Sequence, residues 1–139
     1  MKIAQVAPLI ESVPPQLYGG TERIVSWLTE ELVRQGHDVT LFASGDSSTS
    51  ATLVPITPRA LRLSPSQLDP LPFSIVLIEN VARQAHEFDV LHFHLDHLQY
   101  PMLRTTLTPG LTTMHGRMDL PELIPLFQEF RETPLVSIS

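Results

Sequence analysis

Three stretches of the sequence carry residue types whose spacing could serve chemistry. The first contains paired glycines, Gly19 and Gly20, between a proline-rich loop and an amphipathic segment. The first N–H groups of a helix lack intrahelical partners and lie at the positive end of its dipole, and glycine lets a ligand approach the backbone closely. These glycines could therefore cradle a phosphate or a sugar. A simple turn with Thr21 as the helix N-cap fits the same residues equally well.

The second stretch has the pattern His92-x-His94-x-Asp96-His97 and follows a short apolar run. It resembles the metal-binding signature of the metallo-β-lactamase-like hydrolases, because imidazoles and a carboxylate at a strand end can hold zinc and activate water. That family needs further ligands well downstream, and the only later histidine is His115. The sequence therefore predicts no metal site and no cofactor, and a zinc-dependent hydrolase is the less favoured alternative.

Without a metal, the two strand histidines take different roles. The period of two along a strand places His92 and His94 on the same side. His94 lies nearer the carboxyl end, where open α/β sheets bind ligands, so we expect His94 to contact the ligand and His92 to be structural. Asp96 follows at the same edge, and we expect His97 to be exposed at the start of the next helix. One or both strand histidines could instead be hydrogen-bonded core residues.

A third group of residues, His115-Gly116-Arg117, directly follows the strand-like residues 110–114. We expect it to emerge at the sheet edge that carries the glycine pair and His94, with Gly116 and Arg117 binding substrate. Arg117 could pair with a phosphate or a carboxylate as a planar fork, or remain exposed without a partner.

The segments that position these residues alternate between strand and helix patterns. An apolar run at 3–7 precedes a helix that begins near Thr21 and ends at Gly36, and residues 38–43 form the next strand. Together they predict a right-handed strand–helix–strand unit. Apolar spacing predicts that the following helix residues pack on the sheet: Ile24, Leu28 and Leu32, joined by Val25 and Trp27. Charged residues take the opposite face: Glu22, Arg23, Glu30, Glu31 and Arg34.

The rest of the chain continues this alternation. Asp46, in the polar loop 44–50, is either a ligand for a sugar hydroxyl or a solvated loop residue. Residues 51–72 form a proline-rich connection packed against the domain edge, with a short strand near 52–54. Later helices are expected at 73–88, 98–104 and 121–130, and later strands at 89–94, 110–114 and 133–138. The sequence thus predicts one Rossmann-like, three-layer α/β/α domain over residues 1–139, with a mainly parallel sheet.

Composition limits the partners. The 139 residues carry a formal net charge of -6 without a lysine or arginine cluster, which argues against nucleic acid or an anionic membrane as the main partner. Without cysteine, neither a disulfide nor a thiolate metal site can form. The longest aliphatic run, residues 75–78, is far shorter than the roughly 20 residues of a spanning helix, and the first residues do not read as a leader. A cytoplasmic location is expected.

Several of these stretches together resemble the N-terminal half of a group 1 glycosyltransferase, family 4, which has the two-domain GT-B architecture. The resemblance covers nearly the whole chain and is specific only when its motifs are taken together. The stretches that carry it are residues 1–8, 18–23, 36–42, 89–94, 112–116 and the final strand 136–139.

The resemblance implies roles for individual residues. Gly19 and Gly20 match a glycine loop whose backbone approaches the donor phosphates or the acceptor. His115 matches a catalytic histidine beside the transferred sugar, whose side chain or backbone carbonyl stabilises the positive charge of the transition state. His94 and Asp96 fall on the acceptor side of the cleft.

The resemblance also implies partners. A nucleotide-sugar donor and a sugar or glycan acceptor would meet in a cleft between this domain and a C-terminal donor-binding domain that these 139 residues do not contain. The transfer would retain configuration and need no metal, and the chain alone would transfer sugar poorly or not at all. The resemblance is also compatible with peripheral membrane association of the full-length form and with self-association of the fragment.

Other function classes stay open at this stage. A non-catalytic sugar-binding or regulatory module is the main alternative, because a lone domain can keep its fold and lose its chemistry. A nicotinamide-dependent dehydrogenase would share the first strand–helix–strand unit, but the sequence lacks G-x-G-x-x-G.

Overall fold

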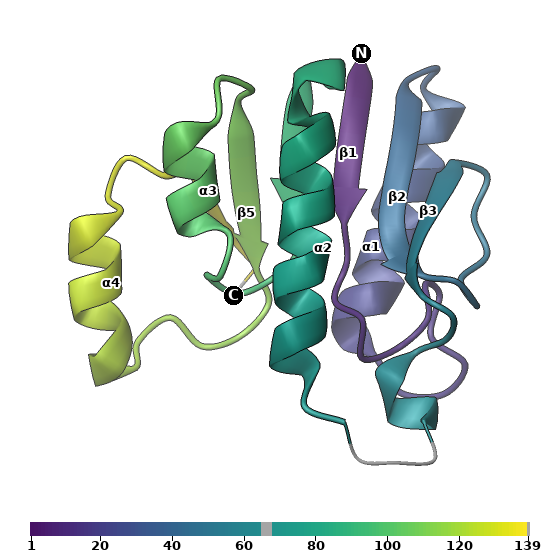
Figure 1. Ribbon diagram of the computed structural model, residues 1–139, viewed down its shortest axis with the longest axis horizontal. Helices are drawn as coiled ribbons and strands as arrows, with labels where there is room; N and C mark the ends of the chain where they lie inside the picture. The colour runs from purple at the N-terminus through teal and green to yellow at the C-terminus, as the bar shows by residue number, and fades with distance from the viewer. Residues whose placement is uncertain (65–67, 139) are drawn as a thin grey trace.

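The strands of this protein form one parallel sheet between helices. The computed structural model describes residues 1–64 and 68–138, and Figure 1 shows the arrangement of its elements. Pro65 in the predicted connection and Ser139 in the predicted last strand lie outside the described residues. No described helix is both long enough and apolar enough to traverse a lipid bilayer.

The sheet has six strands in the order β3-β2-β1-β4-β5-β6, and all of its pairs are parallel. Ile3 on the central strand β1 pairs with Val39 of β2 and Val90 of β4. The strand order reverses beside β1, which is the kind of position where open α/β sheets bind ligands. The strands are β1 Lys2–Val6, β2 Asp38–Ser44, β3 Thr52–Thr57, β4 Val90–Phe93, β5 Gly110–Met114 and β6 Leu135–Ser137.

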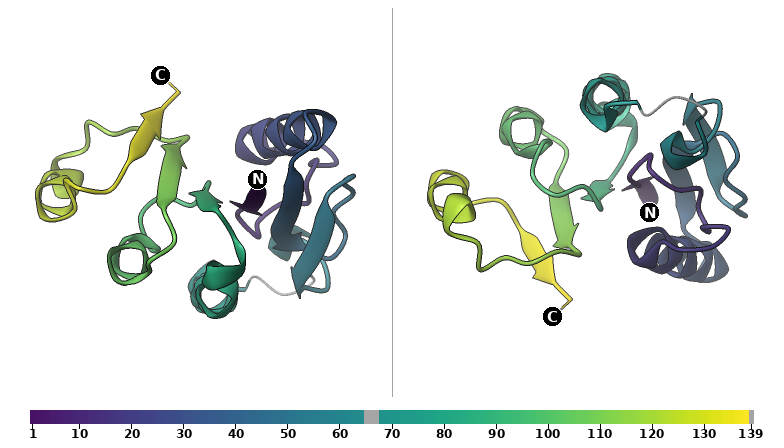
Figure 2. Two further views of the ribbon diagram at one scale, coloured as in Figure 1. Left: turned by 90° about the horizontal axis from the view of Figure 1, so that it is seen from above. Right: turned by 90° about the horizontal axis from the view of Figure 1, so that it is seen from below.

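The helices cover both faces of the sheet. Figure 2 shows α1 on one face and α2, α3 and α4 on the other, as right-handed crossovers require. The predicted Rossmann-like α/β/α layers are therefore confirmed. The helices are α1 Gly20–Arg34, α2 Pro70–Gln84, α3 Tyr100–Thr105 and α4 Ile124–Glu129, with single 3-10 turns at Leu61–Leu63, Ala85–Glu87 and Pro121–Leu123.

Two helices begin earlier than the sequence predicts. Gly19 takes the N-cap position of α1, so Thr21 lies inside the helix and is not its cap. Helix α2 begins at Pro70 and not at residue 73, because the Asp69 side chain accepts a hydrogen bond from Leu71 N at 2.9 Å and caps the first turn. Proline at the first position needs no N–H partner, so it is compatible with this start.

The packing face of α1 differs from the predicted one. Val25, Ser26 and Thr29 are buried, whereas Ile24 is 37% and Trp27 62% exposed. The small side chains at positions 26 and 29 let the helix lie close to the sheet, so the larger apolar residues on either side of them lie further out. The prediction that Ile24 and Trp27 pack on the sheet is wrong.

The proline-rich connection contains a longer strand than predicted. Strand β3 spans Thr52–Thr57 and lies at the edge of the sheet, where Pro55 can sit without leaving a ladder carbonyl unpaired. The preceding loop is fixed by Asp46, whose two carboxylate oxygens accept from Ala60 N at 3.0 and 3.1 Å. Asp46 therefore holds this connection against the sheet edge.

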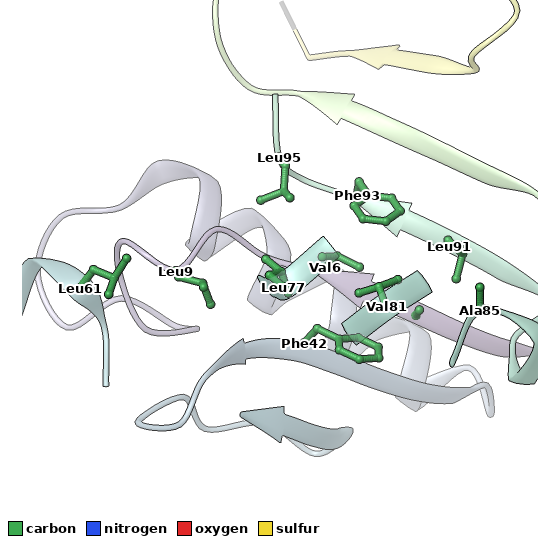
Figure 3. Packing of buried hydrophobic residues seen from close by; sticks show 11 residues of the cluster. Val6, Leu9, Phe42, Leu61, Leu77, Val81, Ala85, Leu91, Phe93 and Leu95 are labelled. Carbon is green, nitrogen blue, oxygen red and sulfur yellow. The ribbon is translucent and has the colours of Figure 1, made fainter. Parts of the chain in front are cut away.

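The main core lies between the sheet and α2. Figure 3 shows Val6, Phe42 and Phe93 of three adjacent strands beside Leu77 and Val81 of the helix. Each is essentially inaccessible to solvent, and burying a side chain of this size contributes roughly 1.5–3 kcal/mol. This core fixes the strands whose carboxyl ends form the site.

The two glycines at the ends of α1 provide a stability test. Gly36 has φ +85 and its N–H donates to Val33 O, whereas Gly20 has open space where a Cβ would lie. We expect Gly36→Ala to lower the free energy of unfolding by about 1 kcal/mol, because an L side chain is strained at positive φ. Gly20→Ala should change it by less than about 0.5 kcal/mol in either direction.

Urea denaturation of both variants beside the wild type measures the difference. Equal stability of the two variants would contradict the assignment of Gly36 as the helix-ending glycine.

Candidate functional site

A cleft of about 930 Å³ opens at the carboxyl edge of the sheet. The loop after β1, the first turns of α1 and the ends of β4 and β5 supply most of its walls. Predicted site residues that line it are Gly19, Gly20, His94, Asp96, His115 and Gly116, whereas Arg117 does not line it.

The glycine loop is built for close approach. A Cβ on Gly19 would lie 2.8 Å from Pro15 Cβ and 3.0 Å from Glu22 Oε2, and its φ of +157 disfavours other residues. Gly20 has no heavy atom within 4 Å of an added Cβ. The N-terminus of α1 therefore faces the cleft with its backbone open on one side, which suits an anion or a sugar.

Buried acidic residues line the cleft beside this loop. Glu22 is 5% exposed and Glu11 6% exposed, and Arg62 Nε lies 2.6 Å from Glu11 Oε1. Burial raises the pKa of Glu22, and the negative charge of Glu11 raises it further. Glu22 therefore lies inside the protein and not on the solvated polar face of α1 that the sequence predicts.

A hydrogen-bonded histidine cluster reaches the cleft through His94 and His115. His92 Nε2 contacts Thr113 Oγ1 at 2.8 Å and its Nδ1 contacts Gln5 Nε2 at 3.3 Å. His94 Nε2 lies 2.7 Å from Gln5 Oε1, and His94 Nδ1 lies 2.9 Å from His115 Nε2. Three strands thus supply one connected polar row.

Burial keeps the imidazoles of this cluster neutral. It lowers the pKa of His92 to about 4 and that of His94 to about 2, with smaller contributions from neighbouring histidines. Burial also lowers the pKa of His115, which the negative charge of Asp96 partly offsets. A neutral imidazole has one N–H and one lone pair, so each ring in the cluster can donate at one nitrogen and accept at the other.

The histidines differ in their freedom to meet a ligand. His94 is 3% exposed, and both of its ring nitrogens bond to protein side chains. It borders the cleft but holds His115, so a polar contact from His94 to a ligand would require one of these bonds to break. His97 is half-buried, contrary to the exposed position predicted for it, because it turns into the cleft wall ahead of α3.

Arg117 is turned towards a protein partner. Its Nε and Nη2 donate to the two carboxylate oxygens of Asp119, each at 2.9 Å, and both side chains are exposed. The planar fork predicted for a ligand contacts Asp119 in this structure, and the alternative of an arginine without a partner is wrong.

The H-x-H-x-D-H pattern does not assemble as a metal centre. Among the described residues, no three histidine or acidic side chains stand close enough together to hold an ion. The ring nitrogens of His92 and His94 that a metal would need are bonded to Gln5, Thr113 and His115.

Some residues of the cleft have no signature in the sequence. Glu11 and Arg62 meet only through folding, since 51 positions separate them and neither belongs to a motif. Gln5 can be found from the sequence, because it is the one polar residue in the apolar run 3–7. In the structure its side chain is fully buried. A buried amide needs hydrogen-bond partners, and strand neighbours are the nearest source.

The buried histidines predict acid sensitivity. Because the folded pKa values of His92 and His94 lie below the ordinary 6.5, the unfolded chain binds protons first. The contribution of these histidines to the free energy of unfolding is therefore fully present above pH 6.5. It falls as the pH decreases towards 4, by about 1.4 kcal/mol per pH unit for each of the two. Urea denaturation at pH 7, 6 and 5 measures this slope.

His94→Gln should reduce the pH dependence of the free energy of unfolding by about the contribution of one histidine. His86→Gln, at an exposed position outside the cluster, is the matched control and should keep it. A wild-type slope in His94→Gln would show that His94 does not carry the effect.

Comparisons with known proteins agree with this fold. The chain matches the sequence model of Glycosyltransferase Family 4 over residues 18–136. AviGT4, a glycosyltransferase involved in avilamycin A biosynthesis, is 24% identical over 84% of this chain and 32% of its own, with a TM-score of 0.52. Sucrose-phosphate synthase from Thermosynechococcus elongatus is 18% identical over 84% of this chain and 33% of its own, with a TM-score of 0.52.

A comparison with curated proteins found no match. The chain spans about a third of the length of the two solved structures, and its likeness to them shows a shared fold. Since the family model covers most of the sequence, the chain belongs to Glycosyltransferase Family 4.

Proposed function

We propose that this chain is the acceptor-side domain of a hexosyltransferase that moves a sugar from a nucleotide-sugar donor to a sugar or glycan acceptor. The transfer retains the configuration of the sugar and uses no metal. The observation that carries this proposal is the single cleft in which the start of α1, the acidic residues and His115 meet. In this proposal the C-terminal domain that binds the donor lies outside these 139 residues.

The start of α1 suits the donor phosphates. The helix has 15 residues, and its first-turn N–H groups border the cleft next to Gly20. The helix dipole and first-turn N–H groups, which lack the carbonyl partners of the helix interior, both favour a negative charge at this end. Gly20 leaves room for a phosphate oxygen or a sugar against the backbone.

Other side chains of the cleft suit an uncharged sugar. Carboxylates such as Glu11 and Asp96 accept hydrogen bonds from sugar hydroxyls, and both line the cleft. Tyr18 and Trp27 line it too and are 77% and 62% exposed, so their rings are available to cover an apolar sugar face. The acidic side chains of the cleft disfavour an anionic acceptor.

His115 is the catalytic residue of this proposal. Its ring is tied to His94 through Nε2, so the backbone carbonyl is the group that we expect to face the developing positive charge. A carbonyl oxygen carries partial negative charge and can stabilise an oxocarbenium-like transition state without a proton transfer. Gly116, which follows it, has open space for a Cβ and leaves this point accessible.

Gly20→Ala tests ligand approach without damaging the fold. We expect the variant to bind nucleotide sugars at least several-fold more weakly than the wild type, because a methyl group fills the space beside the helix N-terminus. Titration of the chain with a panel of nucleotide sugars, followed by NMR, measures the affinity. Gly36→Ala, at the far end of the same helix, is the control and should leave the affinity unchanged. Equal affinities of Gly20→Ala and the wild type would exclude a ligand at this glycine.

The chain alone should transfer sugar poorly or not at all, because half of the positioning groups belong to the donor-binding domain. Transfer assays with the chain, with and without a family donor-binding domain added in trans, test this expectation.

EDTA should not reduce any restored activity, and NMR of the product should show the configuration of the donor. Turnover at ordinary enzyme rates by the chain alone would contradict the prediction. Sugar binding without turnover in every combination would favour the non-catalytic sugar-binding module instead.

A further inference from the structure

The side chain of Gln5 sets the direction of the hydrogen bonds in the histidine cluster. Its Nε2 donates to His92 Nδ1, and its Oε1 accepts from His94 Nε2. An amide nitrogen can only donate and an amide oxygen can only accept, so Gln5 decides which nitrogen of each ring carries the proton. His94 is protonated at Nε2, and its Nδ1 offers a lone pair to His115.

This direction continues into the cleft. The Nε2 of His115 lies 2.9 Å from His94 Nδ1 and must donate to that lone pair. A neutral His115 then has its own lone pair on Nδ1. That nitrogen is buried and has no hydrogen-bond partner within the described chain. A buried acceptor without a donor is unfavourable, and a hydroxyl from a ligand would satisfy it once the groups that shield this nitrogen from solvent move aside.

The opposite orientation of the Gln5 amide is less favourable. It would reverse every bond in the row and leave His115 with an unpaired N–H at Nδ1. Buried N–H groups without an acceptor are rarer in proteins than acceptors that lack a donor. The charged group near His115 is Asp96, which attracts a proton but does not bond to the ring.

We propose that Gln5 is a positioning residue that acts through His94 to fix His115 as a hydrogen-bond acceptor at Nδ1. At this point the cleft then selects a ligand hydroxyl over a phosphate oxygen, since two lone pairs repel each other. The identification of that hydroxyl with a sugar rests on the proposed function, whereas the direction of the hydrogen bonds does not.

The wild-type chain provides the first test. Long-range ¹H–¹⁵N NMR spectra at pH 7.5 report which ring nitrogen carries the proton. We expect the proton on Nε2 of His92, His94 and His115. A proton on Nδ1 of His115 would overturn the proposal, and this measurement does not depend on any variant being folded.

Two substitutions on either side of the row separate positioning from structural support. Gln5→Met keeps the length of the side chain but removes both polar atoms, so His115 should lose its single tautomer. Thr113→Val removes the hydroxyl that pairs with His92 and leaves Gln5 in contact with His94. It should keep the His115 tautomer. Loss of the tautomer in Thr113→Val, or its retention in Gln5→Met, would overturn the proposal.

Binding supplies a readout linked to function. With neutral monosaccharides as probes, Gln5→Met should bind about three- to tenfold more weakly than the wild type, the range expected for one hydrogen bond. Inorganic phosphate should bind equally to both proteins. If no sugar binds the wild type while the tautomers are as assigned, the transferase proposal fails and the positioning role of Gln5 stands. If sugars bind but His115 carries its proton on Nδ1, the positioning role of Gln5 fails and the transferase proposal stands.

Discussion

The parallel pairing of β1 with β2 and β4 is the constraint on which the rest of this structure depends. Because the strands run in one direction, the loops after β1, β4 and β5 all leave the sheet at the same edge. The glycine loop, His94 and His115 are far apart in sequence but are brought to one cleft in this way. A register shift of one residue would turn each strand's side chains to the opposite face and disperse the site.

The same alternation explains why a polar row crosses the middle of the sheet. Val6 and Phe93 point to the face that α2 covers, so Gln5 and His92, which pair across β1 and β4, point to the other face. Among the described residues, α1 is the helix on that face, and it lies beside β1 and β2 (Figure 2). Polar side chains are tolerated there because they satisfy one another, and their mutual bonds hold the site in place.

The sequence predicts the elements of this fold well and the contacts between them poorly. Apolar runs locate the strands, and turn residues such as Gly36 locate the helix end, because both signals are local. The predicted buried face of α1 is wrong at Ile24 and Trp27, because apolar spacing does not distinguish a helix face in the core from one that lines a cleft. The Glu11–Arg62 pair and the Asp119 partner of Arg117 arise from packing and loop geometry that no spacing rule describes.

The electrostatics of the cleft divide it into two regions. The start of α1 attracts anions, yet Glu22 in its first turn would oppose a phosphate if it were fully charged. Burial and Glu11 raise the pKa of Glu22, so the incoming negative charge of a phosphate would favour its protonation further. In the proposed hydrogen-bond direction, the neutral histidine row ends in a lone pair on His115 Nδ1, which would accept a hydroxyl. A nucleotide sugar has both kinds of group, so in the proposed function this division would orient such a ligand with its phosphates at α1 and its sugar at His115.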